Sequence, residues 1–224
     1  MTTTPSYEYY GMMAEFWDLF RGDTSTWDDR FFFLDVVKKY GQPVLDVGCG
    51  TGRILLDFMQ QGIDIDGVDN SPEMLALCKQ KAEKLDLTPA VYQQEMHQLS
   101  LPGGVLVMSF MTLWKEGDPL ESESTREAVR PGDGATIRCS TYTRFDPATG
   151  FEHALERYEI IRGGKVVGSE KHRQSPATRS YAQEQAAALY REAALEDIQV
   201  FHEFTFESVK PQDTLFSVLG FKPR

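Results

Sequence analysis

The stretch of sequence that decides the fold is Val44-Leu45-Asp46-Val47-Gly48-Cys49-Gly50-Thr51-Gly52-Arg53. A short apolar strand here runs directly into a turn whose glycines are spaced G-x-G-x-G. Glycine permits a tight turn and leaves open space where a side chain would otherwise stand. A helical pattern begins at Arg53. This order of strand, glycine turn and helix is typical of a nucleotide-cofactor site.

The pattern continues into a second strand that ends in an acid. We predict a helix from Arg53 to Gln61 that ends at Gly62, and then a strand over residues 63–68 that leads to Asp69. A carboxylate at the end of a second strand is placed to accept hydrogen bonds from the two hydroxyls of a ribose.

The glycine spacing argues against a nicotinamide cofactor. A nicotinamide fingerprint reads G-x-G-x-x-G, with the third glycine one residue later than Gly52. Asp46 would also repel a pyrophosphate, whereas it can accept a hydrogen bond from an ammonium group. S-adenosylmethionine carries both an amino-acid ammonium and a ribose, so it fits this turn better. A nicotinamide-dependent oxidoreductase is therefore a third, less favoured hypothesis for the function.

At this point the sequence resembles the class I S-adenosylmethionine-dependent methyltransferases. Residues 45–52 look like the first motif of that family, and residues 68–75 look like the second. The resemblance implies that the turn lies against the methionine part of the cofactor, that Asp69 binds the ribose, and that an acid near residue 95 meets the adenine amino group. The cofactor-binding residues implied in this way are Asp46, Gly48, Cys49, Gly50, Gly52, Asp69, Asn70, Met74, Glu95 and Met96.

Composition is that of a globular enzyme domain. The chain has 224 residues with 41% hydrophobic content, which is enough to fill one large core or a core with an inserted subdomain. Its three cysteines form no C-x-x-C pair, so we expect reduced thiols. Cys49 is explained better as a small residue in a tight turn than as a nucleophile.

Charge and hydropathy exclude several function classes. The net charge of −11 disfavours a general basic surface for nucleic acid. There is no apolar run of about 18 residues and no charged-then-apolar leader, so we expect a cytoplasmic protein without a membrane partner. The four histidines show no metal-ligand spacing, and we expect no metal site.

Several further elements follow from apolar spacing. Residues 7–20 are dense in aromatics, and we expect a helix with a buried face that either packs only or also closes over the cofactor. Helices are also predicted over 28–40 and over 71–85, the latter with Ser71 as N-cap and Pro72 at its first position. Strands are predicted over 90–92 and 105–110.

The connection between the last two strands is short for this family. Members of the family place a fourth strand and helical segments there, but only the twelve residues 93–104 are present. A parallel crossover alone needs about a dozen residues. We therefore expect a Rossmann-like sheet that is abbreviated in the middle, in which the strand 105–110 either slides next to the first strand or leaves a gap.

The second half of the chain carries an antiparallel β insertion. Residues 116–134 read as a loop, and strands are predicted over 136–145, 151–162 and 165–174 with hairpin turns between them. The predicted organisation is a methyltransferase domain formed by residues 1–115 and 176–224, with an insertion over residues 116–175. A helix over 181–195 and an antiparallel pair of strands over 197–204 and 214–219 close the sheet.

This insertion resembles that of small-molecule methyltransferases such as the amino-sugar and glycine or sarcosine N-methyltransferases. In those enzymes the insertion covers the substrate or forms a dimer contact, so the resemblance also implies a possible homodimer. His153, His172 and Arg173 lie in the insertion. A histidine can act as a base near neutral pH, but we expect these side chains to face solvent.

The sequence predicts α/β architecture and methyl transfer from S-adenosyl-L-methionine to an amine or hydroxyl of a small molecule. Such catalysis can rest on positioning and on exclusion of water, so no catalytic residue is assigned. The alternative is a non-catalytic or degenerate cofactor-binding protein that has lost its substrate face with the fourth strand.

Overall fold

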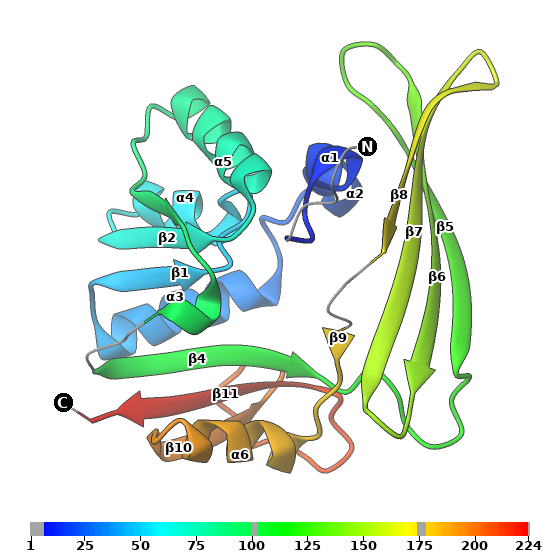
Figure 1. Ribbon diagram of the computed structural model, residues 1–224. Coiled ribbons are helices and arrows are strands. Elements are labelled where there is room, and N and C mark those ends of the chain that lie inside the picture. The colour runs from blue at the N-terminus through cyan, green and yellow to red at the C-terminus, as the bar shows by residue number, and fades with distance from the viewer. Residues whose placement is uncertain (1–6, 100–102, 174–177, 224) are drawn as a thin grey trace.

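The computed structural model describes residues 7–99, 103–173 and 178–223. Its strands form three sheets, as Figure 1 shows: a parallel sheet in the order β1-β2-β3, an antiparallel sheet in the order β10-β11-β4, and a larger antiparallel sheet of β5 to β9 that stands to one side. The chain is therefore a mixed α/β protein, as the sequence predicts. No helix among the described residues is long and apolar enough to cross a membrane.

The parallel sheet is built from the segments around the glycine turn. Its strands are β1 (Val44–Val47), β2 (Ile65–Asp69) and β3 (Val91–Gln93). The helices that accompany them are α3 (Asp28–Tyr40), α4 (Arg53–Gln60) and α5 (Pro72–Lys84), and a short 3-10 helix, η1 (Met96–Gln98), follows β3. Apolar side chains at helical spacing bury one face of each helix, and the resulting core includes Leu55, Phe58, Ile65, Leu75 and Cys78.

The start of α5 illustrates how local sequence sets this region. The Ser71 hydroxyl accepts a hydrogen bond from the Met74 backbone N–H at 3.1 Å, and Pro72 occupies the first helical position. Both features stabilise the start of a helix, where the backbone N–H groups have no partner within the helix. The serine hydroxyl accepts a hydrogen bond from one of them, and proline has no N–H group. The predicted N-cap is confirmed.

The second sheet contains the C-terminal strands. It pairs β4 (Gly104–Met111) with β11 (Leu215–Lys222) and β11 with β10 (Glu196–His202), all antiparallel. Helix α6 (Gln183–Glu192) packs on it through Ala186 and Tyr190. The predicted C-terminal helix and strand pair are confirmed, although the helix is shorter at both ends than residues 181–195.

The two smaller sheets are not joined by strand pairing. Among the described residues, β1 pairs only with β2, and β4 pairs only with β11. Helix α3 connects the sheets instead: Val37 packs in the core of the parallel sheet, whereas Phe32 and Val36 pack against Leu219 and the strand β4. Apolar packing through one helix therefore holds the halves together.

The third sheet corrects one prediction. Residues 116–134 were expected to form a loop, but residues 121–129 form strand β5 (Glu121–Val129), which pairs with β6 (Thr136–Asp146). This edge strand is polar and exposed on nearly all positions, so it shows no apolar alternation that would reveal a strand. Backbone pairing and polar cross-strand contacts such as Ser122–Thr143 at 2.8 Å hold it in place.

The other strands of this sheet follow the predicted hairpins. They are β7 (Phe151–Arg162), β8 (Lys165–Arg173) and the short β9 (Thr178–Arg179), which pairs with the start of β7. The N-terminal helices α1 (Gly11–Glu15) and α2 (Trp17–Arg21) lie between α5 and this sheet, as Figure 1 shows. Met13 and Phe16 are buried against Ile137, Cys139 and Tyr158 of the sheet, so the predicted buried face is confirmed.

Candidate functional site

A cavity of about 830 Å³ opens where β1 and β2 end, above the glycine turn. The carboxyl ends of parallel strands are the usual place for a ligand in open α/β sheets. We call this space the glycine-turn cavity. Of the residues proposed from the sequence, those that line it are Gly48, Cys49, Gly50, Gly52, Asp69, Asn70, Met74, Glu95 and Met96.

The glycines of the turn have two different roles. Gly48 adopts φ of +75°, and a Cβ built there would meet nothing within 4 Å, so this position leaves open space toward the cavity. Gly52 adopts φ of +83°, but a Cβ there would lie 2.6 Å from Cys78 Sγ and 2.9 Å from Leu56 Cγ. Gly48 therefore keeps the cavity clear, whereas Gly52 permits helix α4 to pack.

Cys49 has the environment of a packing residue. It is buried, and its Sγ would lie 2.8 Å from a Cβ built on Gly67. Burial, together with the negative charges of Asp46 and Asp69, raises the pKa of this thiol, so the thiolate needed for nucleophilic chemistry is disfavoured. The structure supports the interpretation of Cys49 as a small residue in a tight turn.

Asp69 holds the turn in shape. Its Oδ2 accepts a hydrogen bond from the Gly50 N–H at 2.8 Å, and its Oδ1 accepts one from the Ser71 N–H at 2.8 Å. A carboxylate has about four acceptor positions, so each oxygen can take a further hydrogen bond from the cavity. The side chain is largely buried yet lines the cavity, which suits a bidentate contact with a diol.

The far end of the cavity is formed by residues around β3 and η1. The Asn70 Nδ2 lies 3.4 Å from Glu95 Oε2, which is near the limit of a weak hydrogen bond. Met74 is buried beside Gly50, whereas Met96 is exposed at 57% of its surface. This end is therefore closed at Met74 and open to solvent at Met96.

Asp46 lies outside the lining of the cavity. Desolvation by burial raises the pKa of its carboxyl from an ordinary value near 3.8 to about 6. A hydrogen bond from the Leu55 backbone N–H and the charge of Arg53 act in the opposite direction and lower it. The carboxyl is thus held beside the start of α4, and contact with a cofactor ammonium stays a prediction for this residue.

The shifted pKa of Asp46 makes its effect on stability depend on pH. Because the folded pKa is raised, the carboxyl favours folding below about pH 4, and the protein loses this stability as pH rises from about 4 to 6. Above pH 6 the contribution of this carboxyl to the free energy of unfolding is lower than below pH 4 by about 3 kcal/mol. Asp46→Asn should therefore raise the free energy of unfolding at pH 7 but not at pH 4, measured by urea unfolding. A stability difference that is the same at both pH values would contradict this.

The N-terminal helices contribute lining residues that sequence reasoning did not assign. Tyr9, Trp17, Asp18 and Arg21 all line the cavity. Asp18 accepts hydrogen bonds from the Thr51 hydroxyl at 2.7 Å and from Lys81 Nζ at 3.0 Å, which ties α2 to the glycine turn and to α5. The aromatic density of this segment is the only signal that the sequence offers for these contacts.

Arg21 is a cation at the mouth of the cavity. Its guanidinium stacks 4.1 Å from the Trp17 ring centre and 5.5 Å from that of Trp27. No salt bridge of Arg21 is present among the residues that the structure describes. Burial and the nearby charge of Arg53 lower its pKa, yet guanidinium remains protonated in proteins. It is therefore available to bind an anion.

The three polar residues of the insertion that the sequence predicts to face solvent differ in burial. His153 and Arg173 are exposed, as expected, but His172 is 3% exposed, and neither ring nitrogen has a hydrogen-bond partner. The expectation that His172 faces solvent is wrong, because β8 turns this position toward the rings of Tyr10 and Tyr158. Within the described part of the chain, no group of three acidic, histidine or cysteine side chains is arranged to hold a metal.

Comparisons with known proteins show that the chain is similar to methyltransferases. Residues 44–132 match the family model described as a methyltransferase domain. The phosphatidylethanolamine N-methyltransferase of Cereibacter sphaeroides is 29% identical over 57% of this chain and 64% of its own length. The human glycine N-methyltransferase is 37% identical over 29% of this chain and 23% of its own length. The matched stretches thus span less than two thirds of these relatives.

Solved structures show the same fold over most of the chain. A sugar N-methyltransferase from Streptoalloteichus superposes with a TM-score of 0.68 and 20% identity, covering 100% of this chain and 99% of that one. An amino pentose methyltransferase from Micromonospora echinaspora, solved with S-adenosylmethionine bound, gives a TM-score of 0.61 and 17% identity, covering 94% and 97%. The likeness in fold includes the large antiparallel sheet.

Proposed function

Because this chain belongs to the class I S-adenosylmethionine-dependent methyltransferases, we propose that it transfers a methyl group to an amine or hydroxyl of a small molecule. The observation that carries this proposal is the glycine-turn cavity, with open space over Gly48 and a carboxylate, Asp69, at its edge. An amine is the favoured acceptor, since the similar proteins include glycine and sugar N-methyltransferases.

The residues of the cavity fit S-adenosylmethionine. A volume of about 830 Å³ lies within the range of small-molecule sites, about 300 to 1,000 Å³. The open side of Gly48 admits close approach of the methionine part, and Asp69 retains acceptor positions for the ribose. Asn70, Met74, Glu95 and Met96 surround the end where the adenine is proposed to lie.

We also assign binding partners to the carboxylate and the ammonium group of the cofactor. We assign its carboxylate to Arg21, a cation that lines the cavity without a salt bridge among the described residues. Its ammonium is assigned to backbone carbonyls of the turn and to the negative charge of Asp46. An ammonium nearby would favour the ionised form of Asp46 and so oppose the desolvation that raises its pKa.

The protein's contribution to the chemistry is positional. Bound S-adenosylmethionine supplies a methyl group on a positively charged sulfur, and an acceptor with a free electron pair takes it in line. Tyr9 and Trp17 form an aromatic wall at the cavity, with ring centres 4.9 Å apart, and this wall keeps water away from the reacting atoms. No general base is assigned, because alignment of two bound reactants by itself gives large rate accelerations.

Replacement of Arg21 tests the cofactor assignment at the mouth of the cavity. Arg21→Ala should weaken S-adenosylmethionine binding about tenfold, because it removes one charge-assisted contact. Arg21→Lys should recover part of the affinity, since it keeps the charge but loses the planar guanidinium. Isothermal titration calorimetry measures both variants. Equal affinity of wild type and Arg21→Ala for S-adenosylmethionine would show that Arg21 does not bind the cofactor.

A second candidate function follows from the unjoined sheets. β1 and β4 do not pair among the described residues, and we interpret residues 93–104 as too short to supply the fourth strand of the family. That strand carries substrate-facing residues, so the chain could bind the cofactor without transferring its methyl group. Cofactor binding and turnover therefore need separate measurements.

We propose that the large antiparallel sheet helps to bind the methyl acceptor. We treat residues 116–175 as an insertion into a methyltransferase domain formed by residues 1–115 and 176–224. The face of this sheet that carries Tyr158 is directed toward the N-terminal helices and hence toward the cavity. For that face we favour a role in covering the bound substrate over a role as a dimer contact.

The deciding experiment is calorimetric titration of the folded protein with S-adenosylmethionine and with S-adenosylhomocysteine. Micromolar affinity for both supports the proposed site, and a screen of small amines with detection of S-adenosylhomocysteine then tests turnover. Affinity without turnover across the screen favours the non-catalytic alternative. A folded protein that binds neither compound contradicts both functions.

A further inference from the structure

We infer that Glu170 and Arg130 are positioning residues for the cofactor site, although neither lines the cavity. Both hold the N-terminal segment in place from the large antiparallel sheet. This inference rests on the proposed function, since it assigns these residues an effect on S-adenosylmethionine affinity. It also gives the sheet a role that does not depend on the identity of the acceptor.

The segment that they hold comprises residues 9–21, which we call the N-terminal lid. On one side the lid lines the cavity through Tyr9, Trp17, Asp18 and Arg21. Three hydrogen bonds tie this side to the parallel-sheet half: the Ser71 hydroxyl donates to the Tyr9 carbonyl, and the Thr51 hydroxyl and Lys81 Nζ both donate to Asp18. The lid therefore has to be seated for the cavity to be complete.

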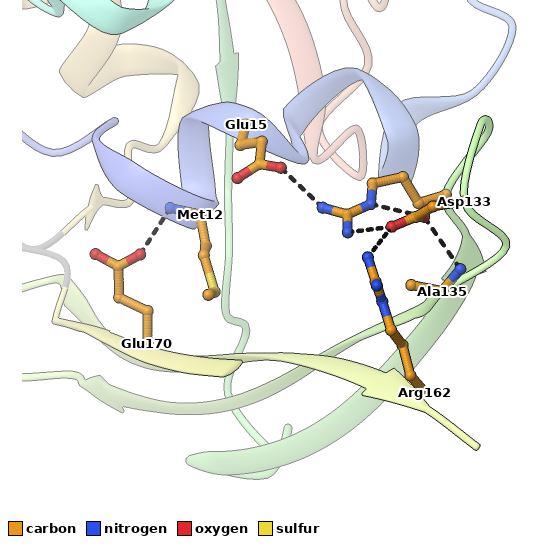
Figure 2. A network of polar contacts seen from close by, with 7 residues as sticks. Met12, Glu15, Asp133, Ala135, Arg162 and Glu170 are labelled. Carbon is orange, nitrogen blue, oxygen red and sulfur yellow. Dashed lines mark hydrogen bonds and ion pairs between the residues drawn. The ribbon is translucent and has the colours of Figure 1, made fainter. Parts of the chain in front are cut away.

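Glu170 fixes the beginning of the lid helix. Its Oε2 accepts a hydrogen bond from the Met12 backbone N–H at 2.7 Å, as Figure 2 shows. A carboxylate suits this place, because the first N–H groups of a helix have no partner within it. The approach is close: a Cβ on Gly11, whose φ is +53°, would lie 2.8 Å from Glu170 Cδ. Glycine at this position lets the carboxylate reach the backbone.

Arg130 fixes the end of the same helix. Its Nη1 lies 3.1 Å from Glu15 Oε1, and its other nitrogens bind the two oxygens of Asp133 at 3.0 and 2.6 Å. Asp133 also accepts hydrogen bonds from Arg162 and from the Ala135 N–H, as Figure 2 shows. These contacts fix the carboxylate that binds Arg130. Hydrogen bonds from Arg130 and Ala135 lower the pKa of Asp133, which keeps it ionised.

Apolar contacts fill the space between these two polar attachments. Met13 and Phe16 are buried against Ile137, Cys139 and Tyr158 of the sheet. The buried ring of His172 lies 4.5 Å from the ring of Tyr10, with its Nε2 3.6 Å from Glu170 Oε1. The underside of the lid is thus held by the sheet along the whole length of α1.

These contacts couple the sheet to the cofactor site. If only the seated lid completes the cavity, the apparent dissociation constant equals the intrinsic one divided by the seated fraction. Loss of one charge-assisted hydrogen bond can shift such an equilibrium about tenfold. Residues of the sheet can therefore change cofactor affinity without any contact with the cofactor.

The test compares Glu170→Ala with Glu170→Gln in calorimetric titrations of the full chain with S-adenosylmethionine. Glutamine retains an oxygen that accepts from the Met12 N–H, so it should keep affinity near that of wild type, whereas alanine should lose up to about tenfold. Arg130→Ala should lose affinity in the same direction. Arg138→Ala is the matched control, since Arg138 pairs with Glu127 and Glu159 on the opposite face of the sheet and should bind normally.

Amide hydrogen exchange in residues 9–21 supplies a second readout. Glu170→Ala should speed exchange in the lid while the exchange of β1 and β2 stays unchanged. Wild-type affinity in both Glu170→Ala and Arg130→Ala would overturn the inference while leaving the proposed function intact. Equal affinity loss in Arg138→Ala would also overturn it, because the effect would then be general destabilisation of the sheet. A wild-type protein that does not bind the cofactor would contradict the proposed function itself.

Discussion

Asp69→Ala is expected to weaken S-adenosylmethionine binding about 100-fold. The substitution removes the proposed ribose acceptor and also the two hydrogen bonds that Asp69 accepts from the backbone of Gly50 and Ser71. Each hydrogen bond to a charged group contributes about 1.5 to 3 kcal/mol, and about 1.4 kcal/mol corresponds to a tenfold change. Calorimetric titration measures the loss, after a thermal melt has shown that the variant folds cooperatively.

Asp69→Asn separates the two roles of this side chain. Asparagine keeps one oxygen that can accept a backbone hydrogen bond, but it lacks the charge and the second acceptor that a ribose diol requires. Because one of the two backbone N–H groups keeps its acceptor and the other loses it, we expect a partial loss of stability together with clearly weakened binding. Unaltered affinity in Asp69→Ala would overturn the ribose contact.

Gly52→Ala is expected to destabilise the fold by about 3 kcal/mol. Two costs add: a left-handed backbone of φ +83° is strained for alanine, and its Cβ would overlap Cys78 Sγ, which lies 2.6 Å away. Cys78 and Leu56 are fully or almost fully buried, so neither side chain has room to move. The shift in the urea midpoint measures the loss.

Gly48→Ala is the matched variant for the same turn. Its φ of +75° is similar, but a Cβ there meets open space, so we expect a stability loss of only about 1 kcal/mol. Cofactor affinity should fall strongly, because the added methyl would occupy the space that we assign to the methionine part. Normal binding in Gly48→Ala would exclude the proposed placement. Normal stability in Gly52→Ala would contradict the packing role of Gly52.

The sequence alone determined the elements around the glycine turn. Helices α3, α4 and α5 and the strands of the parallel sheet follow from short-range signals, such as apolar spacing, the Ser71 N-cap and the glycines themselves. Nine of the ten proposed cofactor residues line one cavity, because they lie at the ends of three neighbouring parallel strands, β1, β2 and β3. The choice of these residues rests on the resemblance of the sequence to the methyltransferase motifs, and their proximity follows from the order of the parallel strands.

Tertiary structure decided what depends on contacts between distant segments. Strand β5 has no apolar alternation and exists because β6 pairs with it. His172 is buried because the N-terminal lid covers it. Met12 and Glu170 are 158 positions apart, and no local pattern predicts that they meet. Such a hydrogen bond requires the lid to lie on the sheet, where Met13 and Phe16 are buried, so the lid's attachments are a property of the folded chain rather than of any segment.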